Sequence, residues 1–510
     1  MSGQEILLVV LFLGLFAGIL SGIPAMLAIA GVPFLLAVAA GQFGLFNLDF
    51  LANYPARVQG IMANTLLMAV PLFVLMGVFL ERANLAETML KVLARLLGGS
   101  PLGMALSVLA FSAIIAASTG IIGATVVMLV LIALTPMLEA GVPRRQAAGL
   151  ICASGTLGQI IPPSILLVLL GDQIGNTYLE AQQRRGNFAP EPVSVADLFA
   201  GAMLPGLVLV GLYALWLLIT LRPGRARRVG ARQPVSATEV LFTFLPPLLL
   251  ILAVLGSILG GVATATEAAG LGAVGAGLMA AFTLTRLRWE RGLIALAGLA
   301  AFALVALKMA GIGRAGAGEW ASIAAALVLA AGVTIGIVRL ALGRILGPAM
   351  VETIKISGMV FGIVIAASML SLVFRGFGGE RAVEHLTHEF PGGDIGALMA
   401  VMTLVFLLGF ILEAVEIIYI VVPLLGPAVL SGDIPPVWFA VLMAMNLQTS
   451  FLTPPFGFAL FYFRSVAPPQ ITTLDIYRGV VPFVLIQLLA LALVFLFPGL
   501  ATWLPHQMFN

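Results

Sequence analysis

The chain has 510 residues, of which 61% are hydrophobic and only 9% are charged, whereas an average soluble protein is about 25% charged. This composition excludes a soluble globular domain of any size, and a net charge of +3 gives no indication of nucleic-acid binding. Cys152 is the only cysteine, so an intrachain disulfide is also excluded.

Apolar runs of about 20 residues recur along the whole length, which predicts an all-α polytopic membrane protein. The first run carries Glu5 and no preceding basic region, so we expect a retained helix, not a cleaved signal. In the first half, the predicted spanning helices cover residues 5–20, 24–43, 61–80 and 198–221. A basic amphipathic connector is predicted over residues 81–97.

Residues 101–138 form a long apolar stretch whose centre, AASTGIIGAT at 116–125, is small and polar. This centre is poorly suited to an exposed loop between two full spans. The pattern instead favours a re-entrant hairpin of two half-helices with its tip at residues 118–120.

A broken helix follows, because GTLGQIIPPS at 155–164 interrupts an apolar run from 147 to 170. Pro162 and Pro163 remove two backbone donors and push the preceding residues out of the helical region. A broken middle at bilayer depth is tolerated only where it is buried in protein or lines a water-filled cavity. We expect a polar loop over 172–197 after it.

The second half repeats this plan. The segment Thr453-Pro454-Pro455 aligns with Ile161-Pro162-Pro163 at an offset of 292 residues (453 − 161). Spans are predicted at 240–259, 265–285, 356–374 and 480–497, with a hairpin over 395–430 whose tip lies at 409–416, and a broken helix around 446–457. Two extra helices, at 292–310 and 321–340, have no counterpart in the first half.

Counting five spans per repeat and the inserted pair, we predict about 12 spanning helices and two re-entrant hairpins. Most Lys and Arg residues then fall in cytoplasmic loops if the two hairpins enter from opposite sides, which makes the repeats inverted. Arg184, Arg185, Arg375 and Arg381 are exceptions, and they lie near acidic residues.

The two hairpin tips and the two breaks are the predicted functional site, because interrupted segments at corresponding positions indicate a transporter binding site. Helix N-termini favour anions, and free carbonyls favour cations. The residues gathered there are oxygen-rich and sulfur-free, which suits a hard cation such as Na⁺ and not zinc or copper. They are Ser118, Thr119, Gly120, Gly123, Gly155, Thr156 and Gly158 in the first half, and Gly409, Glu413, Asn446, Gln448, Thr449, Ser450 and Thr453 in the second. The alternative is that small residues only let helices pack closely.

Acidic and histidine residues elsewhere need separate interpretations. Glu413 and Glu416 lie in an apolar stretch, where carboxylates are usually functional. Glu413 is the better ligand candidate, whereas Glu416 is equally well explained by pairing or by facing water. Glu267 follows Thr264 in a capping-box pattern, so we expect a structural role. His385 and His388 have a metal-like spacing, but a solvated loop explains them better because no third ligand is near.

Four segments carry a family resemblance: AASTGIIGATVV, ICASGTLGQIIPPSI, ATATEAAG and NLQTSFLTPPFGFALFYFRSVAP. Over nearly the whole chain the sequence resembles the large, DctM-like membrane subunit of tripartite ATP-independent periplasmic (TRAP) transporters, in the subgroup labelled for mannitol or chloroaromatic compounds. The resemblance implies an ion-transporter-superfamily fold with an elevator-type transport domain. It also implies Na⁺-coupled uptake of a carboxylate across the bacterial inner membrane, and two partners, a small four-helix membrane subunit (DctQ-like) and a periplasmic substrate-binding protein (DctP-like). No cofactor is expected apart from Na⁺ as the coupling ion.

The same resemblance implies the roles of individual residues. Sodium ligands are expected at Ser118, Thr119, Gly155, Thr156, Gly158, Gly409, Glu413, Thr449 and Thr453. Solute contacts are expected at Ser118, Gly120, Pro162, Pro163, Asn446, Gln448, Ser450, Pro454 and Pro455. The chain departs from the common pattern at the first tip, where Ser118-Thr119-Gly120 replaces Ser-Gly-Ser, and at Ser450 and Glu413, which replace a frequent Gly and a frequent Asp.

The expected domain division follows from the repeats. Residues 101–172 and 394–465, each a hairpin and a broken helix, form the transport domain. Residues 1–100, 173–290, 346–393 and 466–510 form the scaffold, and 291–345 hold the inserted pair. A stand-alone dicarboxylate or citrate carrier of the same superfamily is the alternative. A channel and an intramembrane enzyme are further alternatives. The sequence carries no catalytic motif that would support an enzyme.

Overall fold

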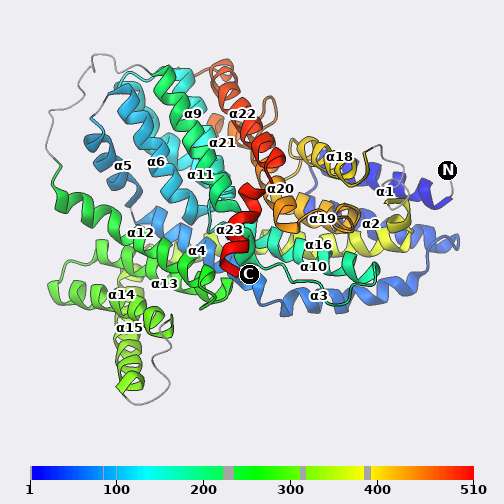
Figure 1. Ribbon diagram of the computed structural model, residues 1–510, viewed down its shortest axis with the longest axis horizontal. Coiled ribbons are helices and arrows are strands. Elements are labelled where there is room, and N and C mark those ends of the chain that lie inside the picture. Colours follow the sequence, from blue (N-terminus) through cyan, green and yellow to red (C-terminus); the bar gives the residue numbers. More distant parts are fainter. Residues whose placement is uncertain are drawn as a thin grey trace.

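The computed structural model describes residues 3–83, 85–98, 100–221, 235–309, 317–383 and 392–509, with side chains except at 3, 4, 117–119, 309, 317 and 318. Every regular element in these ranges is a helix (Figure 1). The first half contains α1 (Gly3–Leu20), α2 (Ala25–Gln42), η1 (Leu48–Asn53), α3 (Tyr54–Ala63), η2 (Leu66–Met68), α4 (Ala69–Arg82), α5 (Leu85–Leu96), α6 (Pro101–Thr119), α7 (Ile122–Leu129), η3 (Val130–Leu134), α8 (Thr135–Glu139), α9 (Arg144–Thr156), η4 (Leu157–Gln159), α10 (Ile165–Arg184) and α11 (Val195–Thr220). The second half contains α12 (Ala237–Leu259), α13 (Ala265–Leu284), α14 (Arg288–Met309), α15 (Ala317–Leu342), α16 (Leu346–Gly376), α18 (Gly393–Leu408), α19 (Ala414–Leu430), α20 (Pro436–Leu452), α21 (Phe458–Val466), α22 (Thr473–Leu496) and α23 (Gly499–Phe509).

The chain is a polytopic membrane protein. Nine of the described helices are long and apolar enough to span a bilayer, or ten if the bent pair Leu48–Ala63 and Leu66–Arg82 is one span. Ile122–Glu139 is one of the nine, whereas Pro101–Ala116 is a shorter apolar helix. The second arm of the first hairpin is therefore long enough to cross, so the re-entrant hairpins and the count of about 12 spans stay predictions.

The predicted third span is bent, not straight. The two parts of this region meet at an angle of 55°. Asn64 lies at the bend, where its side-chain oxygen accepts a hydrogen bond from the backbone N–H of Leu66 at 2.9 Å. A short polar side chain that bonds the backbone two residues ahead competes with a continuing helix.

The helix after each break packs on the hairpin of the other half of the chain. α10, which follows the first break, packs on α19, the second arm of the second hairpin. In the same way, α21 follows the second break and packs on α7 of the first hairpin. α9 crosses α22 so closely that a Cβ added to Gly149 would lie 2.0 Å from the carbonyl oxygen of Gly479. Small residues of this kind allow direct backbone contact between membrane helices.

Two boundaries differ from the sequence prediction. The polar loop expected over 172–197 is wrong in its first part, because α10 continues to Arg184 and buries Asp172, Thr177 and Ala181. Polar composition concealed this helix. The chain also does not end on its last span, because α23 follows Pro498 and packs on α11.

The inserted helices α14 and α15 pack on each other and on α13, and α15 projects from the edge of the molecule at the lower left of Figure 1. Glu290 joins them through a bidentate pair, accepting from Nε of Arg339 at 2.7 Å and from its terminal nitrogen at 2.5 Å.

Two of the exceptional arginines, Arg184 and Arg375, lie in an ion-pair cluster at the far end of α10. Arg184 contacts Glu180 and Glu380, each at 2.8 Å, and Arg375 contacts the same two carboxylates at 2.7 and 2.9 Å. Two of the four arginines that depart from the charge distribution are thus neutralised locally. Glu384 lies outside the described residues.

Candidate solute and cation site

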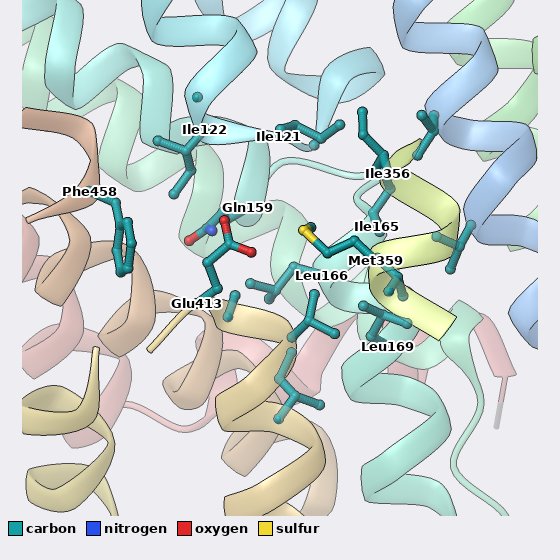
Figure 2. A pocket seen from close by; sticks show the side chains of 18 of the residues that line it. Ile121, Ile122, Gln159, Ile165, Leu166, Leu169, Ile356, Met359, Glu413 and Phe458 are labelled. Atoms are coloured by element: carbon teal, nitrogen blue, oxygen red, sulfur yellow. The ribbon is translucent and has the colours of Figure 1, made fainter. Parts of the chain in front are cut away.

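A cavity of about 260 Å³ lies where the two hairpin tips and the two breaks meet (Figure 2). Residues of α4 and α16 complete its wall. The lining residues are Val70, Val74, Gly120, Ile121, Ile122, Gly123, Gln159, Ile165, Leu166, Leu169, Ile356, Met359, Val360, Glu413, Ala414, Val415, Ile418, Phe451, Phe458 and Tyr462. Segments about 290 residues apart therefore enclose one space, which is the arrangement expected of paired interrupted segments.

The first tip is a tight backbone turn. Gly120 ends α6 with φ +59°, a left-handed conformation that glycine adopts without steric cost. The first break packs directly on this turn, since a Cβ on Gly158 would lie 3.2 Å from the carbonyl oxygen of Ala116 and 3.5 Å from the Gly120 nitrogen. Ser118 and Thr119 belong to the last turn of α6, but their side chains are outside the described part of the chain.

The second tip carries the charge. Glu413 precedes α19 and lines the cavity, and its backbone N–H donates to a carboxylate oxygen of Glu416 at 3.1 Å. Glu416 is buried and acts as a cap for this helix start, whereas the Glu413 side chain points into the cavity (Figure 2). The two carboxylates, which lie three residues apart in the sequence, therefore have different roles: Glu416 caps the helix and Glu413 faces the cavity.

Gly409 allows the second tip to lie against the second broken helix. A Cβ added there would be 2.0 Å from the Ser450 hydroxyl oxygen. In the first half, a Cβ on Gly155 would lie 2.3 Å from a methyl group of Val126 on α7. Both predicted glycines therefore have a packing role that a larger residue would not fulfil.

Opposite helix ends converge at the cavity. Helices α7, α10, α19 and α21 begin at or next to lining residues, so their N-termini and free backbone N–H groups are directed to this region. Helices α6, α18 and α20 end at the same tips and breaks, as does α9 through the short helix η4, and these ends supply free carbonyl groups. The backbone alone therefore offers places for an anion and for a cation.

The hydroxyl groups of Thr156, Thr449 and Ser450 are buried, and that of Thr453 is half-buried. Each donates a hydrogen bond to a carbonyl of its own helix. Thr156 donates to the Ala153 carbonyl at 2.8 Å and accepts from Gln487 at 3.3 Å. Thr449 donates to the Met445 carbonyl at 2.7 Å. The Ser450 hydroxyl donates to the Leu447 carbonyl, and the Thr453 hydroxyl donates to the Thr449 carbonyl. The Asn446 side-chain amide donates to the Met402 carbonyl on the neighbouring helix α18. Their oxygen atoms keep lone pairs that a cation could use.

Other predicted residues lie near the site but not on the cavity surface. Both X-Pro bonds, Pro162-Pro163 and Pro454-Pro455, are cis and lie in the two breaks. Gln448 is buried in α20, and neither its amide oxygen nor its amide nitrogen has a hydrogen-bond partner among the described residues. The structure brings Gly120, Gly123 and Glu413 to the cavity wall directly.

Glu267 is a cap, as predicted. Its carboxylate accepts the Thr264 backbone N–H at 2.9 Å, and the Thr264 hydroxyl accepts the Glu267 N–H at 3.2 Å. His385 and His388 lie outside the described residues. Within the described ranges, no three His, Cys, Asp or Glu side chains are grouped so as to hold a metal ion.

Gln159 is a site residue that the sequence did not indicate. It lies in η4 at the first break, it is 4% exposed, and its amide oxygen has no hydrogen-bond partner within the described structure. Its side chain points into the same space as Glu413 (Figure 2). The available signal was a glutamine three residues before the prolines Pro162-Pro163, inside the broken stretch.

Asp172 is a second residue that sequence reasoning missed. It is buried in α10, one turn beyond the cavity-lining Leu169. One carboxylate oxygen accepts from the Asn64 amide at 2.8 Å, and the other accepts from Gln173 at 3.0 Å and from the Tyr419 hydroxyl at 3.4 Å. This cluster joins the bend between α3 and α4 to α10 and α19, directly behind the cavity wall.

Comparison with known proteins identifies the chain. The pattern of the family described as "Tripartite ATP-independent periplasmic transporter, DctM component" matches residues 8–312 and 294–500. The chain is 25% identical over 94% of both chains to the C4-dicarboxylate TRAP transporter large permease protein DctM of Vibrio cholerae. It is 27% identical to the isethionate TRAP transporter permease protein DctMQ of Oleidesulfovibrio alaskensis, over 94% of this chain and 65% of that one.

A solved structure supports the fold independently. The YdaH transporter of Alcanivorax borkumensis has a TM-score of 0.52 to this chain at 14% sequence identity, covering 90% of this chain and 89% of that one. At this identity the likeness concerns the fold alone. Together with the match over nearly the whole sequence, these observations show that the chain is a transport permease, not an enzyme, and that it belongs to the DctM family of large TRAP transporter subunits.

Proposed function

We propose that this permease couples the inward movement of Na⁺ to the uptake of a small organic anion across the bacterial inner membrane. The observation that carries the proposal is the convergence of both tips and both breaks on one cavity. Each break contributes one carbonyl-rich helix end and one amide-rich helix start. Such broken segments hold the coupling ion and the substrate together in secondary transporters.

Cation binding would use the carbonyl ends of α6, α9, α18 and α20, together with Glu413. Among the described residues that line the cavity, Glu413 is the one carboxylate. A carboxylate at this depth is unfavourable without a positive partner, and Glu413 forms no ion pair with another described residue. Na⁺ at the second tip would neutralise it. The hydroxyls of Thr156, Thr449 and Thr453 are the supporting oxygen groups we assign to this role.

Anion binding would use the starts of α7, α10, α19 and α21. Each helix N-terminus carries roughly half a positive charge, so several of them around one cavity favour a carboxylate without needing a basic side chain. The relatives named above are permeases for C4-dicarboxylates and for isethionate, both of which are anions.

Two further components would complete the transporter. The family is tripartite by name, and the DctMQ relative is longer than this chain. We expect a small membrane subunit and a periplasmic substrate-binding protein that delivers the solute. Within the permease, both hairpins and both broken helices would move as one body, because α10–α19 and α7–α21 packing ties the four segments together.

Reconstituted transport tests this function. The permease, with its co-purified small subunit, is placed in proteoliposomes with an inward Na⁺ gradient, and uptake of the solute carried by its binding protein is measured. We expect uptake that needs both the gradient and the binding protein. Uptake without the binding protein would indicate a stand-alone carrier, and ion current without solute would indicate a channel.

A further inference from the structure

The cavity wall is chemically uneven. Aliphatic and aromatic side chains from α4, α10, α16, α19 and α21 form most of it. Ile165, Leu166, Leu169, Ile356 and Met359 lie together in Figure 2, on the side away from Phe458. A solute that fills this part of the cavity must present an apolar surface to it, since polar groups there would lose water without gaining hydrogen bonds.

The polar part of the wall is small. Among the described lining residues, Gln159, Glu413 and Tyr462 alone carry polar side-chain atoms. Gln159 and Glu413 point into the cavity from the first break and the second tip (Figure 2). The amide oxygen of Gln159 is buried and has no partner among the described residues. A buried polar atom without a partner is rare in a folded protein, and this one is an acceptor, so this end of the cavity is suited to a cation or a hydrogen-bond donor.

Basic side chains are missing from this wall. None of the described residues that line the cavity is Lys, Arg or His. One carboxylate can be held at the polar end by helix N-termini and by Na⁺ at Glu413. A second carboxylate on the same small solute would face Leu169 and Met359, beyond the helix N-termini and without a basic side chain among the described lining residues, which is strongly unfavourable.

We propose that the permease cavity takes a monocarboxylate with an aliphatic or aromatic body, and not a dicarboxylate or a polyol. The carboxylate lies at the polar end, held by the helix N-termini and by Na⁺ between it and the acceptor oxygens of Gln159 and Glu413. The body lies against Leu169 and Met359. The volume of about 260 Å³ limits this to a small solute. This inference rests on the proposed function, because Na⁺ must neutralise Glu413 before an anion enters.

Thermal stabilisation of the purified permease with its small subunit tests the proposal. The probes are Na⁺ alone, and Na⁺ with cyclohexanecarboxylate, benzoate, succinate or mannitol. We expect Na⁺ to raise the melting temperature, the two monocarboxylates to raise it further in a saturable way, and succinate and mannitol to add nothing.

A substitution in the wall makes the test specific. Met359→Lys adds a cation to the apolar side through a flexible chain at a position that is 41% exposed. It is expected to shift the ratio of succinate to benzoate affinity at least about tenfold toward succinate. Ile354→Lys on the same helix is the matched control, because it is 69% exposed, does not line the cavity and lies beside Lys355.

The outcomes separate the two proposals. Stabilisation by succinate or mannitol as large as that by benzoate, or an unchanged ratio in Met359→Lys, overturns the assignment of the solute. Stabilisation by Na⁺ with no response to either monocarboxylate also overturns it but leaves Na⁺ binding in place. A permease that does not respond to Na⁺ at all contradicts the proposed function itself.

Discussion

The first and second tips have the same position in their repeats but different chemistry. The first tip is a glycine turn at Gly120 beside a neutral amide, Gln159. The second tip carries Glu413, and its glycine, Gly409, has an ordinary φ of −63°. Duplication therefore explains the common backbone plan, whereas the charge that attracts a cation is on one side only.

The helices that follow the two breaks also differ. α10 has 20 residues and is fixed by Asp172 to the bend at Asn64 and to Tyr419. α21 has nine residues and presents aromatic side chains to the cavity. We infer that the first half anchors the site and that the second half supplies its charge.

The largest effect is expected for the charge of the second tip. Glu413→Gln should lower Na⁺-dependent uptake at least about tenfold, since a buried Na⁺ would lose its carboxylate partner. Glu416→Gln removes the same charge three residues away, but its amide oxygen still accepts the Glu413 N–H, so uptake should fall much less. Equal losses in the two variants would show that net charge, and not the position of Glu413, matters.

The next largest effect is expected for Asp172, whose hydrogen bonds fix α10 in the first half. Asp172→Leu leaves the amides of Asn64 and Gln173 and the hydroxyl of Tyr419 without their acceptor, which should destabilise the protein by about 1–3 kcal/mol. Thermal unfolding of the purified protein measures this. Tyr419→Phe removes only the 3.4 Å contact and serves as the mild control. An unchanged melting temperature in Asp172→Leu would exclude an anchoring role.

The two tip glycines should respond differently to a compensating change. Gly409→Ala brings Cβ into Ser450 and should destabilise by about 1–3 kcal/mol, and adding Ser450→Gly should restore stability. Gly120→Ala is strained by its φ of +59°, at about 1–2 kcal/mol. Its nearest added contacts are with Ile165, so Ser450→Gly should not help it. Rescue of both variants, or of neither, would contradict this distinction.

The smallest effects concern the hydroxyl groups. Thr156→Val and Thr449→Val should each raise the Na⁺ concentration for half-maximal uptake severalfold, corresponding to about 1 kcal/mol per lost hydrogen-bonding group. Thr156→Val should have the larger effect because it also leaves Gln487 without its acceptor. Na⁺ titration of uptake measures both. Identical titration curves for wild type and both variants would rule out side-chain ligation.

The breaks and tips were predictable because their signals are local. Consecutive prolines remove donors at known positions, and the repeat offset pairs the two sites. The role of Asp172 was not predictable, because its partners Asn64 and Tyr419 are 108 and 247 residues away in the chain. Gln159 shows the same limitation, since only the folded structure shows that its amide oxygen is buried without a partner.

The central claim is that one cavity between the two tips binds both Na⁺ and the solute. A single thiol at Met359→Cys, in a Cys152→Ala background, reports on this cavity through its labelling rate with a small polar thiol reagent. We predict that Na⁺ and the transported solute together slow labelling of this thiol, and that they leave a thiol at Ile354→Cys unaffected. An unchanged labelling rate at position 359 under saturating Na⁺ and solute, in a variant that still transports, would contradict the claim.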